Sequence, residues 1–214
     1  MFTFVFVVFL WILSVCLHEF AHAKVAYDGG DLSVKDKGYL TLNPLKYLDP
    51  MMSVVMPVVF LMLGGIGLPG AAVYIDTSKL RSTAWQLAVA LAGPGMNLAL
   101  LMVIGMLLSQ SLVSADLRPA LAFVGLLQAS AVVLNLLPIP GFDGYGALAP
   151  HLPPSFRAQF EQFARHGIWV LFLLLFFVPP FARAFWGIVR ILAEAFGVPM
   201  ATAFAGYDQF RFWD

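Results

Sequence analysis

The stretch Met1–Ala23, MFTFVFVVFLWILSVCLHEFAHA, is an almost unbroken apolar run that ends in the pattern His18-Glu19-x-x-His22. At about 1.5 Å per residue, a helix of this length crosses about 30 Å of hydrocarbon, so the run predicts a transmembrane helix. On that helix His18 and His22 share one face, where two imidazoles can take adjacent positions around a zinc ion. Glu19 lies about 100° round the helix, which is the placement of a general base for a metal-held water.

The same spacing arises by chance in soluble helices, but the apolar surroundings argue against chance here. An acid or a base near the centre of a membrane-length helix costs roughly 2.5 to 3.5 kcal/mol, so three polar groups together indicate a functional site. The alternative for the run is a cleaved signal, because Leu13-Ser14-Val15-Cys16 resembles a lipoprotein cleavage box. No lysine or arginine precedes the run, and Val15 is bulky where a small residue is preferred, so we expect a retained helix.

The composition indicates an integral membrane protein. Of the 214 residues, 61% are hydrophobic and 11% are charged, against about 25% charged in an average soluble domain. The basic and acidic side chains balance to a formal charge of zero, which offers no electrostatic footprint for nucleic acid. The single cysteine, Cys16, excludes an internal disulfide. We expect one membrane domain over residues 1–214, with a core at 1–146 and C-terminal interfacial and membrane segments at 151–214.

The expected fold class is an all-α polytopic membrane protein with a core of three transmembrane helices. Besides Met1–Ala23, the segments Ala84–Leu108 and Arg118–Leu137 are long and apolar enough to cross. Met51–Leu63 has only about half the necessary length, which predicts a short or re-entrant element that does not cross.

The remaining segments are polar or broken by proline. Lys24–Asp49 is punctuated by glycine and proline, which favours turns and short extended pieces between Asp31 and Leu42, and Ala71–Ile75 is a further candidate strand. Pro153–His166 mixes phenylalanine with charged residues, which is typical of a helix lying in the membrane interface. The segment 167–196 is apolar on either side of a proline pair, and it forms either one kinked span or a short hairpin.

The basic residues predict the orientation. Lysines and arginines concentrate after the first span, before the second and after the third, whereas the segment between the second and third spans offers only Arg118. The positive-inside bias therefore puts Met1 outside and the His-Glu-x-x-His end of the first helix near the cytoplasm. Water reaches a metal more easily there than at the midplane.

Two histidines leave a catalytic zinc ion short of one protein ligand. The best candidate is Asp143 in the stretch Asn135–Gly144, NLLPIPGFDG, which follows the third span at the depth of both histidines. Phe-Asp-Gly after two prolines is also ordinary turn chemistry, but the topology favours ligation. Asp28 and Asp31 are the alternatives.

Taken together, these motifs resemble those of the site-2 protease family of intramembrane zinc metalloproteases, in its compact form without a PDZ domain. The matching stretches, which occur in the family's order over about two-thirds of the chain, are His18–His22, Gly30-Asp31, Leu42–Leu45, Asp49-Pro50, Ala92–Asn97, Asn135–Pro138 and Asp143-Gly144. The chain departs from the family at Gly67–Ala72, where similar proteins often carry Gly-x-x-Lys-Pro-Val.

The resemblance implies a role for each matching residue. One Zn²⁺ ion would be held by His18, His22 and Asp143, with Glu19 as the catalytic base. Asn135 would donate a hydrogen bond to the substrate or to the oxyanion. The motif containing Gly93, Pro94 and Asn97 would pack the second core helix against the site.

The implied activity is cleavage of the transmembrane segment of a single-span membrane protein near the cytoplasmic face. The expected location is the plasma membrane of a prokaryote, and one of the extended pieces would pair with an unwound substrate segment. The main alternative is a metal-ion transporter or channel that uses His18, His22 and Asp143 as a transient site. A transporter would carry further polar ligands along its spans and internal symmetry, and the sequence displays neither. A third possibility is a non-catalytic relative, which would have no need of Glu19. The sequence does not indicate the oligomeric state.

Overall fold

The computed structural model describes residues 1–46, 73–110, 113–162 and 167–213, and these residues form helices and loops, with no strand among them. The α-helices are α1 (Phe2–Gly29), α2 (Ser33–Asp36), α4 (Thr83–Ser109), α5 (Arg118–Asn135), α6 (Asp143–Leu148), α7 (Pro154–Glu161), α8 (Gly167–Phe177), α9 (Pro179–Ala195) and α10 (Met200–Phe210). Single 3-10 turns lie at η1 (Pro44–Lys46), η3 (Thr77–Lys79) and η4 (Ala149–His151).

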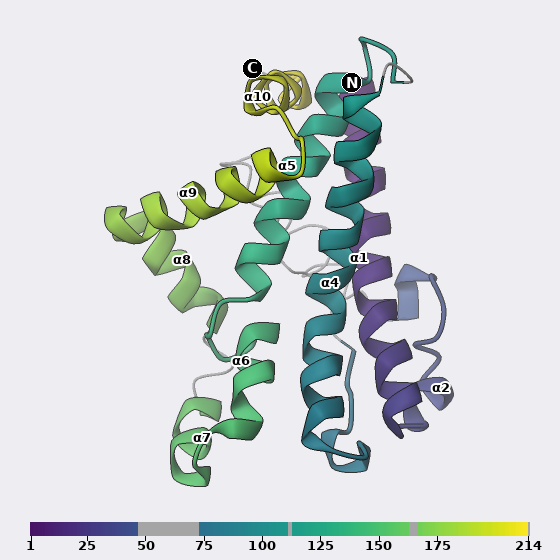
Figure 1. Cartoon of the computed structure of the whole chain (residues 1–214), viewed down its shortest axis with the longest axis vertical. Helices are drawn as coiled ribbons and strands as arrows, with labels where there is room; N and C mark the ends of the chain where they lie inside the picture. The colour runs from purple at the N-terminus through teal and green to yellow at the C-terminus, as the bar shows by residue number, and fades with distance from the viewer. Residues whose placement is uncertain (47–72, 111–112, 163–166, 214) are drawn as a thin grey trace.

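The three predicted spans are confirmed as long apolar helices: α1, α4 and α5 have the length and composition to cross a membrane (Figure 1). α1, α4 and α5 all contact one another, and α5 also contacts α9 and α10. In α5 89% of the span is buried within the protein, against 44% in α1 and 39% in α4. α5 is therefore the central helix, and α1 and α4 leave a face each for lipid.

The first helix is longer than predicted, because α1 continues from Ala23 to Gly29. Nothing in this extension breaks a helix, and Lys24 Nζ lies 2.6 Å from Asp28 Oδ1, a pair spaced one turn apart. The helix ends at Gly29 and is followed by the C-cap residue Gly30, whose φ of 120° is one that a residue with a Cβ rarely adopts.

The expected extended pieces are not confirmed. Between Asp31 and Leu42 the prediction was wrong, since this part contains α2: Asp31 Oδ1 accepts a hydrogen bond from the Ser33 backbone N–H at 3.1 Å, and this local turn starts the helix. Of the candidate strand Ala71–Ile75, the described residues 73–75 have no regular secondary structure, and 71–72 lie outside the described part. Met51–Leu63 also lies outside it.

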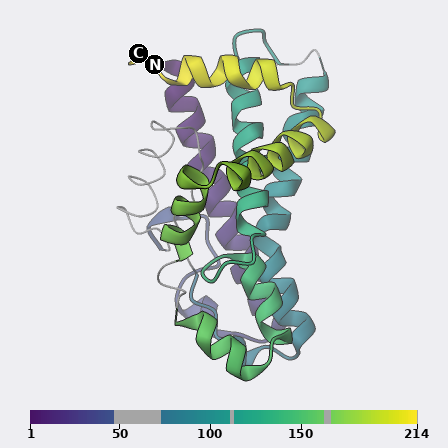
Figure 2. The same ribbon diagram turned by 90° about the vertical axis from the view of Figure 1, so that its left-hand side faces the viewer.

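The C-terminal segment 167–196 contains a sharp bend that fits a broken span as well as a re-entrant hairpin, so both alternatives stay open. α8 and α9 are two helices bent by 99° at Val178, just before the first residue of α9, Pro179, which has no N–H to continue a helix. Figure 2 shows α9 running obliquely across one side of the bundle, where it packs against α5. α7, in the segment expected at the interface, has no buried residue, and its membrane placement stays a prediction.

The sequence did not predict α10. This helix lies across the ends of α1 and α5 that are far from α6, close to both termini of the chain (Figure 1). Ala203 and Phe210 of α10 are fully buried against this end of the bundle. The fold thus closes one end with α10 and leaves the other end, with α6 and α7, to form the site.

Candidate metal centre

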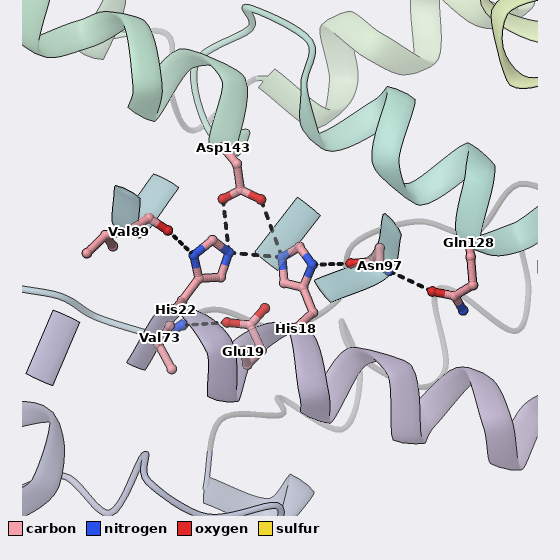
Figure 3. Close-up of polar contacts among 8 residues, drawn as sticks. All are labelled: His18, Glu19, His22, Val73, Val89, Asn97, Gln128 and Asp143. Carbon is pink, nitrogen blue, oxygen red and sulfur yellow. Dashed lines mark hydrogen bonds and ion pairs between the residues drawn. The ribbon is translucent and has the colours of Figure 1, made fainter. Parts of the chain in front are cut away.

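The His-Glu-x-x-His residues lie on the buried side of α1, facing α4 and α6. His18, Glu19 and His22 are 8%, 6% and 5% exposed. The two imidazoles lie one turn apart with their Nε2 atoms 3.0 Å from each other. The helical spacing predicted from the sequence therefore brings both rings to one point, as Figure 3 shows.

Asp143 reaches the same point from the first residue of α6. Its Oδ2 lies 3.3 Å from His18 Nε2, and its Oδ1 lies 3.3 Å from His22 Nε2. Gly144 permits this approach, because a Cβ there would overlap the backbone oxygen of Leu136. The structure thus brings the three predicted metal residues together, as the one cluster with metal-ligand geometry in the described part of the chain.

The alternatives Asp28 and Asp31 are engaged elsewhere. Asp28 pairs with Lys24 on the exposed side of α1. Asp31 is fully buried and accepts hydrogen bonds from the Ser33 hydroxyl at 2.6 Å and from the Asp76 backbone N–H at 2.8 Å. Burial by itself would raise the pKa of Asp31, but these hydrogen bonds hold its pKa below the ordinary value. Asp31 therefore anchors a loop as a carboxylate.

The hydrogen bonds of the two rings show that the site fits a metal. His22 Nδ1 lies 2.7 Å from the backbone oxygen of Val89, which can only accept, so this nitrogen carries the proton. His18 Nδ1 contacts Oδ1 of Asn97 in the same way. A neutral ring that donates from Nδ1 has a lone pair on Nε2, and this is the tautomer of a zinc-binding histidine.

Both Nε2 lone pairs therefore converge with the two carboxylate oxygens of Asp143. Within the described residues Asp143 Oδ2 is buried and accepts no hydrogen bond. Four acceptor atoms at one buried point repel one another unless a cation lies between them. Two imidazoles and a carboxylate are also a donor set of catalytic zinc sites, so the residues fit the ion.

Glu19 stands beside this cluster rather than within it. Its Oε2 accepts a hydrogen bond of 3.1 Å from the Val73 backbone N–H (Figure 3). Glu19 and the three metal residues all line one cavity of about 380 Å³, together with Asn135, Val73 and Ile75. Asn135 is thus at the site, but no hydrogen bond to another described residue assigns it a role.

The segment 73–76 forms one wall of that cavity and is fixed at three points. Val73 donates to Glu19, the Tyr74 backbone oxygen accepts from Lys37 Nζ at 2.7 Å, and Asp76 donates to Asp31. Val73 and Ile75 pack against the small cluster under α1 and α2, whereas Tyr74 is 73% exposed. Side-chain burial alternates along this segment, since Val73 and Ile75 are partly buried and Tyr74 is exposed, and no strand pairs with it among the described residues.

Gly93 and Asn97, which were expected to pack the second span against the site, also contact the two histidine rings directly. A Cβ on Gly93 of α4 would overlap the Nε2 atoms of both His18 and His22, so the rings lie directly against the backbone of α4. Asn97, one turn further, bonds to His18. Its Nδ2 donates to Gln128 Oε1 of α5 at 2.8 Å, a residue that the sequence analysis missed. The available signal was a side-chain amide in the middle of an apolar span.

Comparison with known proteins finds bacterial relatives that carry provisional names as zinc metalloproteases. The chain is 46% identical over 215 residues to Rip2 of Mycobacterium tuberculosis, an alignment that covers 98% of this chain and 81% of that protein. It is 42% identical over 217 residues to Rip2 of Mycolicibacterium smegmatis, with the same shares covered. It is 32% identical over 195 residues to YwhC of Bacillus subtilis, which cover 85% of this chain and 84% of YwhC. No family model and no solved structure matches the chain.

Proposed function

The chain belongs to the family of bacterial zinc metalloproteases that includes Rip2 and YwhC, and we propose that it is an intramembrane endopeptidase of the site-2 protease type. In this proposal it cleaves the transmembrane segments of single-span membrane proteins near the cytoplasmic face. The observation that carries the proposal is the convergence of His18, His22 and Asp143 beside Glu19, on helices able to cross a membrane.

Each residue has a distinct task in the proposed reaction. His18, His22 and Asp143 hold one zinc ion, which when bound supplies Lewis-acid activation of water and of the scissile carbonyl. Glu19 lines the same cavity, where it would take a proton from the attacking water and pass it to the leaving amine. Asn135 lines the same cavity and can donate its amide hydrogens to the substrate or to the developing oxyanion.

The substrate must unwind before its peptide bond can be attacked, because a helix hides its peptide groups in internal hydrogen bonds. Unpaired N–H and C=O groups in the membrane cost several kcal/mol each. The backbone of residues 73–76 lies along the cavity wall and next to Glu19, which makes it the candidate partner for the unwound segment. In this proposal the segment pairs with the substrate by itself, since no strand accompanies it among the described residues.

The proposed location is the plasma membrane of a prokaryote, with the site towards the cytoplasm. The bacterial relatives and the apolar helices support the membrane, and the distribution of lysine and arginine supports the orientation. A cysteine introduced at Lys37 should react with a membrane-impermeant thiol reagent only from the cytoplasmic side. Labelling from outside in intact cells would overturn this orientation.

The experiment that tests the function uses purified protein reconstituted in vesicles with a single-span substrate. We expect zinc-dependent cleavage, loss of cleavage after chelation and recovery when zinc is restored. The same vesicles test the transporter alternative, because a transporter would move labelled zinc across the bilayer without cutting the substrate. Zinc flux without cleavage would refute the protease and leave the metal site standing.

A further inference from the structure

We propose that Gln128 is a positioning residue of the metal centre, which holds the side-chain amide of Asn97 with its carbonyl towards His18 and so keeps His18 in the metal-binding tautomer. The inference rests on the zinc site of the proposed function, but it does not depend on proteolysis.

The three residues form a buried chain that crosses the core. His18 comes from α1, Asn97 from α4 and Gln128 from α5, so each of the three spans contributes one member (Figure 3). Asn97 is 3% exposed and Gln128 is 1% exposed. An amide inside an apolar span is unfavourable unless its polar atoms form hydrogen bonds, so the buried Gln128 amide indicates a structural or functional role for its bond to Asn97.

The direction of the hydrogen bonds carries the argument. The amide of Asn97 can face His18 with either its oxygen or its NH₂ group, and the two orientations differ by one flip. With the oxygen towards His18, Nδ1 of the ring donates and Nε2 keeps its lone pair for a metal. With the NH₂ group towards His18, Nδ1 must accept, and the proton moves to Nε2, where it excludes the metal.

Gln128 stabilises the metal-binding orientation of the Asn97 amide. In that orientation the Asn97 NH₂ group points at α5, where it would be an unsatisfied donor in an apolar span without Gln128 Oε1 at 2.8 Å. With Gln128 in this orientation, turning the Asn97 amide over would bring its oxygen against Gln128 Oε1, where the two oxygens repel each other, so the Asn97 NH₂ group stays towards α5. Gln128 therefore acts on His18 at one remove, through the orientation of Asn97.

The test is a double-mutant cycle read out as zinc affinity, measured by competition with a chromogenic chelator in the absence of substrate. Gln128→Met keeps the length of the side chain and removes the acceptor. We expect it to weaken zinc binding by up to about 10- to 100-fold, the usual effect of losing a partner of a metal ligand, because without Gln128 the partner Asn97 no longer stays oriented towards His18. In an Asn97→Asp background, both carboxylate oxygens accept from His18 whichever way the group turns, so Gln128→Met should there have little effect on zinc affinity.

The matched control is Ser130→Ala, which removes another fully buried polar group of α5. Its hydroxyl donates to the backbone oxygen of Leu127 in its own helix, so zinc affinity should stay at the parent value. Gln128→Asn serves as a second variant if Gln128→Met does not fold, because an amide shortened by one methylene keeps the polarity and loses the reach.

The outcomes separate the orientation from simple packing. Equal losses of zinc affinity in the parent and in the Asn97→Asp background would show that Gln128 only packs, and would overturn the proposal. Unchanged zinc affinity in Gln128→Met would overturn it as well. A parent protein that binds no zinc would refute the metal site and this inference together, whereas a parent that binds zinc but cleaves nothing would refute only the protease.

Discussion

Gly93→Ala is the substitution that probes the metal centre most sharply without replacing a proposed ligand. The added methyl group would overlap the Nε2 atoms of His18 and His22, so either the rings turn away or α4 moves off α1. Neither response preserves a zinc site, since ligand distances are tolerated only within about 0.2 Å. We therefore expect weaker zinc binding in a protein that still folds.

The magnitude follows from the cost of overpacking, which is typically about 1–3 kcal/mol. If the metal-binding arrangement bears the whole cost, zinc affinity falls about 5- to 150-fold, because 1.4 kcal/mol corresponds to a factor of ten. The assay is a zinc titration with a competing chelator, together with thermal unfolding of the zinc-free protein.

Gly95→Ala provides the matched control two residues along the same helix. A Cβ at Gly95 would meet no atom within 4 Å, so the variant should bind zinc as the parent does. Parent-like zinc affinity in Gly93→Ala would refute the packing of both rings against α4. Equal losses in the two variants would show that any alanine in this part of α4 disturbs the site, and would equally refute the reasoning.

Three further predictions concern the ligand, the distant end of the bundle and the loop anchor. Asp143→Ala should lower zinc content at unchanged fold, as measured by metal analysis after dialysis, since two histidines alone hold the ion poorly; full zinc content would require another ligand. Gly105→Ala should lower thermal stability by about 1–3 kcal/mol, because its Cβ would overlap the Phe196 backbone oxygen, while the zinc affinity of the folded protein stays unchanged; a zinc loss would contradict the separation of the two ends. Hydrogen bonds hold the pKa of Asp31 below its ordinary value, against the opposing effect of burial, so the Asp31 carboxylate should stabilise the protein above about pH 4 and lose this contribution as the pH falls through the lowered pKa. The Asp31→Asn variant should therefore unfold at a lower temperature than the parent at pH 7, and the two unfolding temperatures should converge in acid. A difference that persists in acid would refute the role of the charge.

The features that the sequence predicted are those with a long local signal. The three spans follow from length and apolarity, and the pairing of His18 with His22 follows from helical periodicity. The placement of Asp143 needed a longer argument, because depth in the membrane linked it to α1 across a large separation in sequence. The structure brings it to 3.3 Å from both rings.

The features that the sequence missed depend on contacts between distant segments. α2 and α10 are short helices, stabilised by burial of Val34 in one case and of Phe210 in the other rather than by any pattern within them. The right-angled bend between α8 and α9 places α9 on α5, which periodicity cannot specify. Gln128 belongs to the same group, because its partner Asn97 lies on another span.

The central claim is that the chain hydrolyses a peptide bond inside a membrane span, with Glu19 as the base. The most direct measurement is mass spectrometry of the fragments that zinc-loaded protein and its Glu19→Gln variant release from a single-span substrate in vesicles. We predict one new pair of ends within the cytoplasmic half of the apolar span for the parent, and an intact substrate for Glu19→Gln, which keeps its zinc. Ends that map to the soluble flanks of the substrate, or equal cleavage by the variant, would contradict the account.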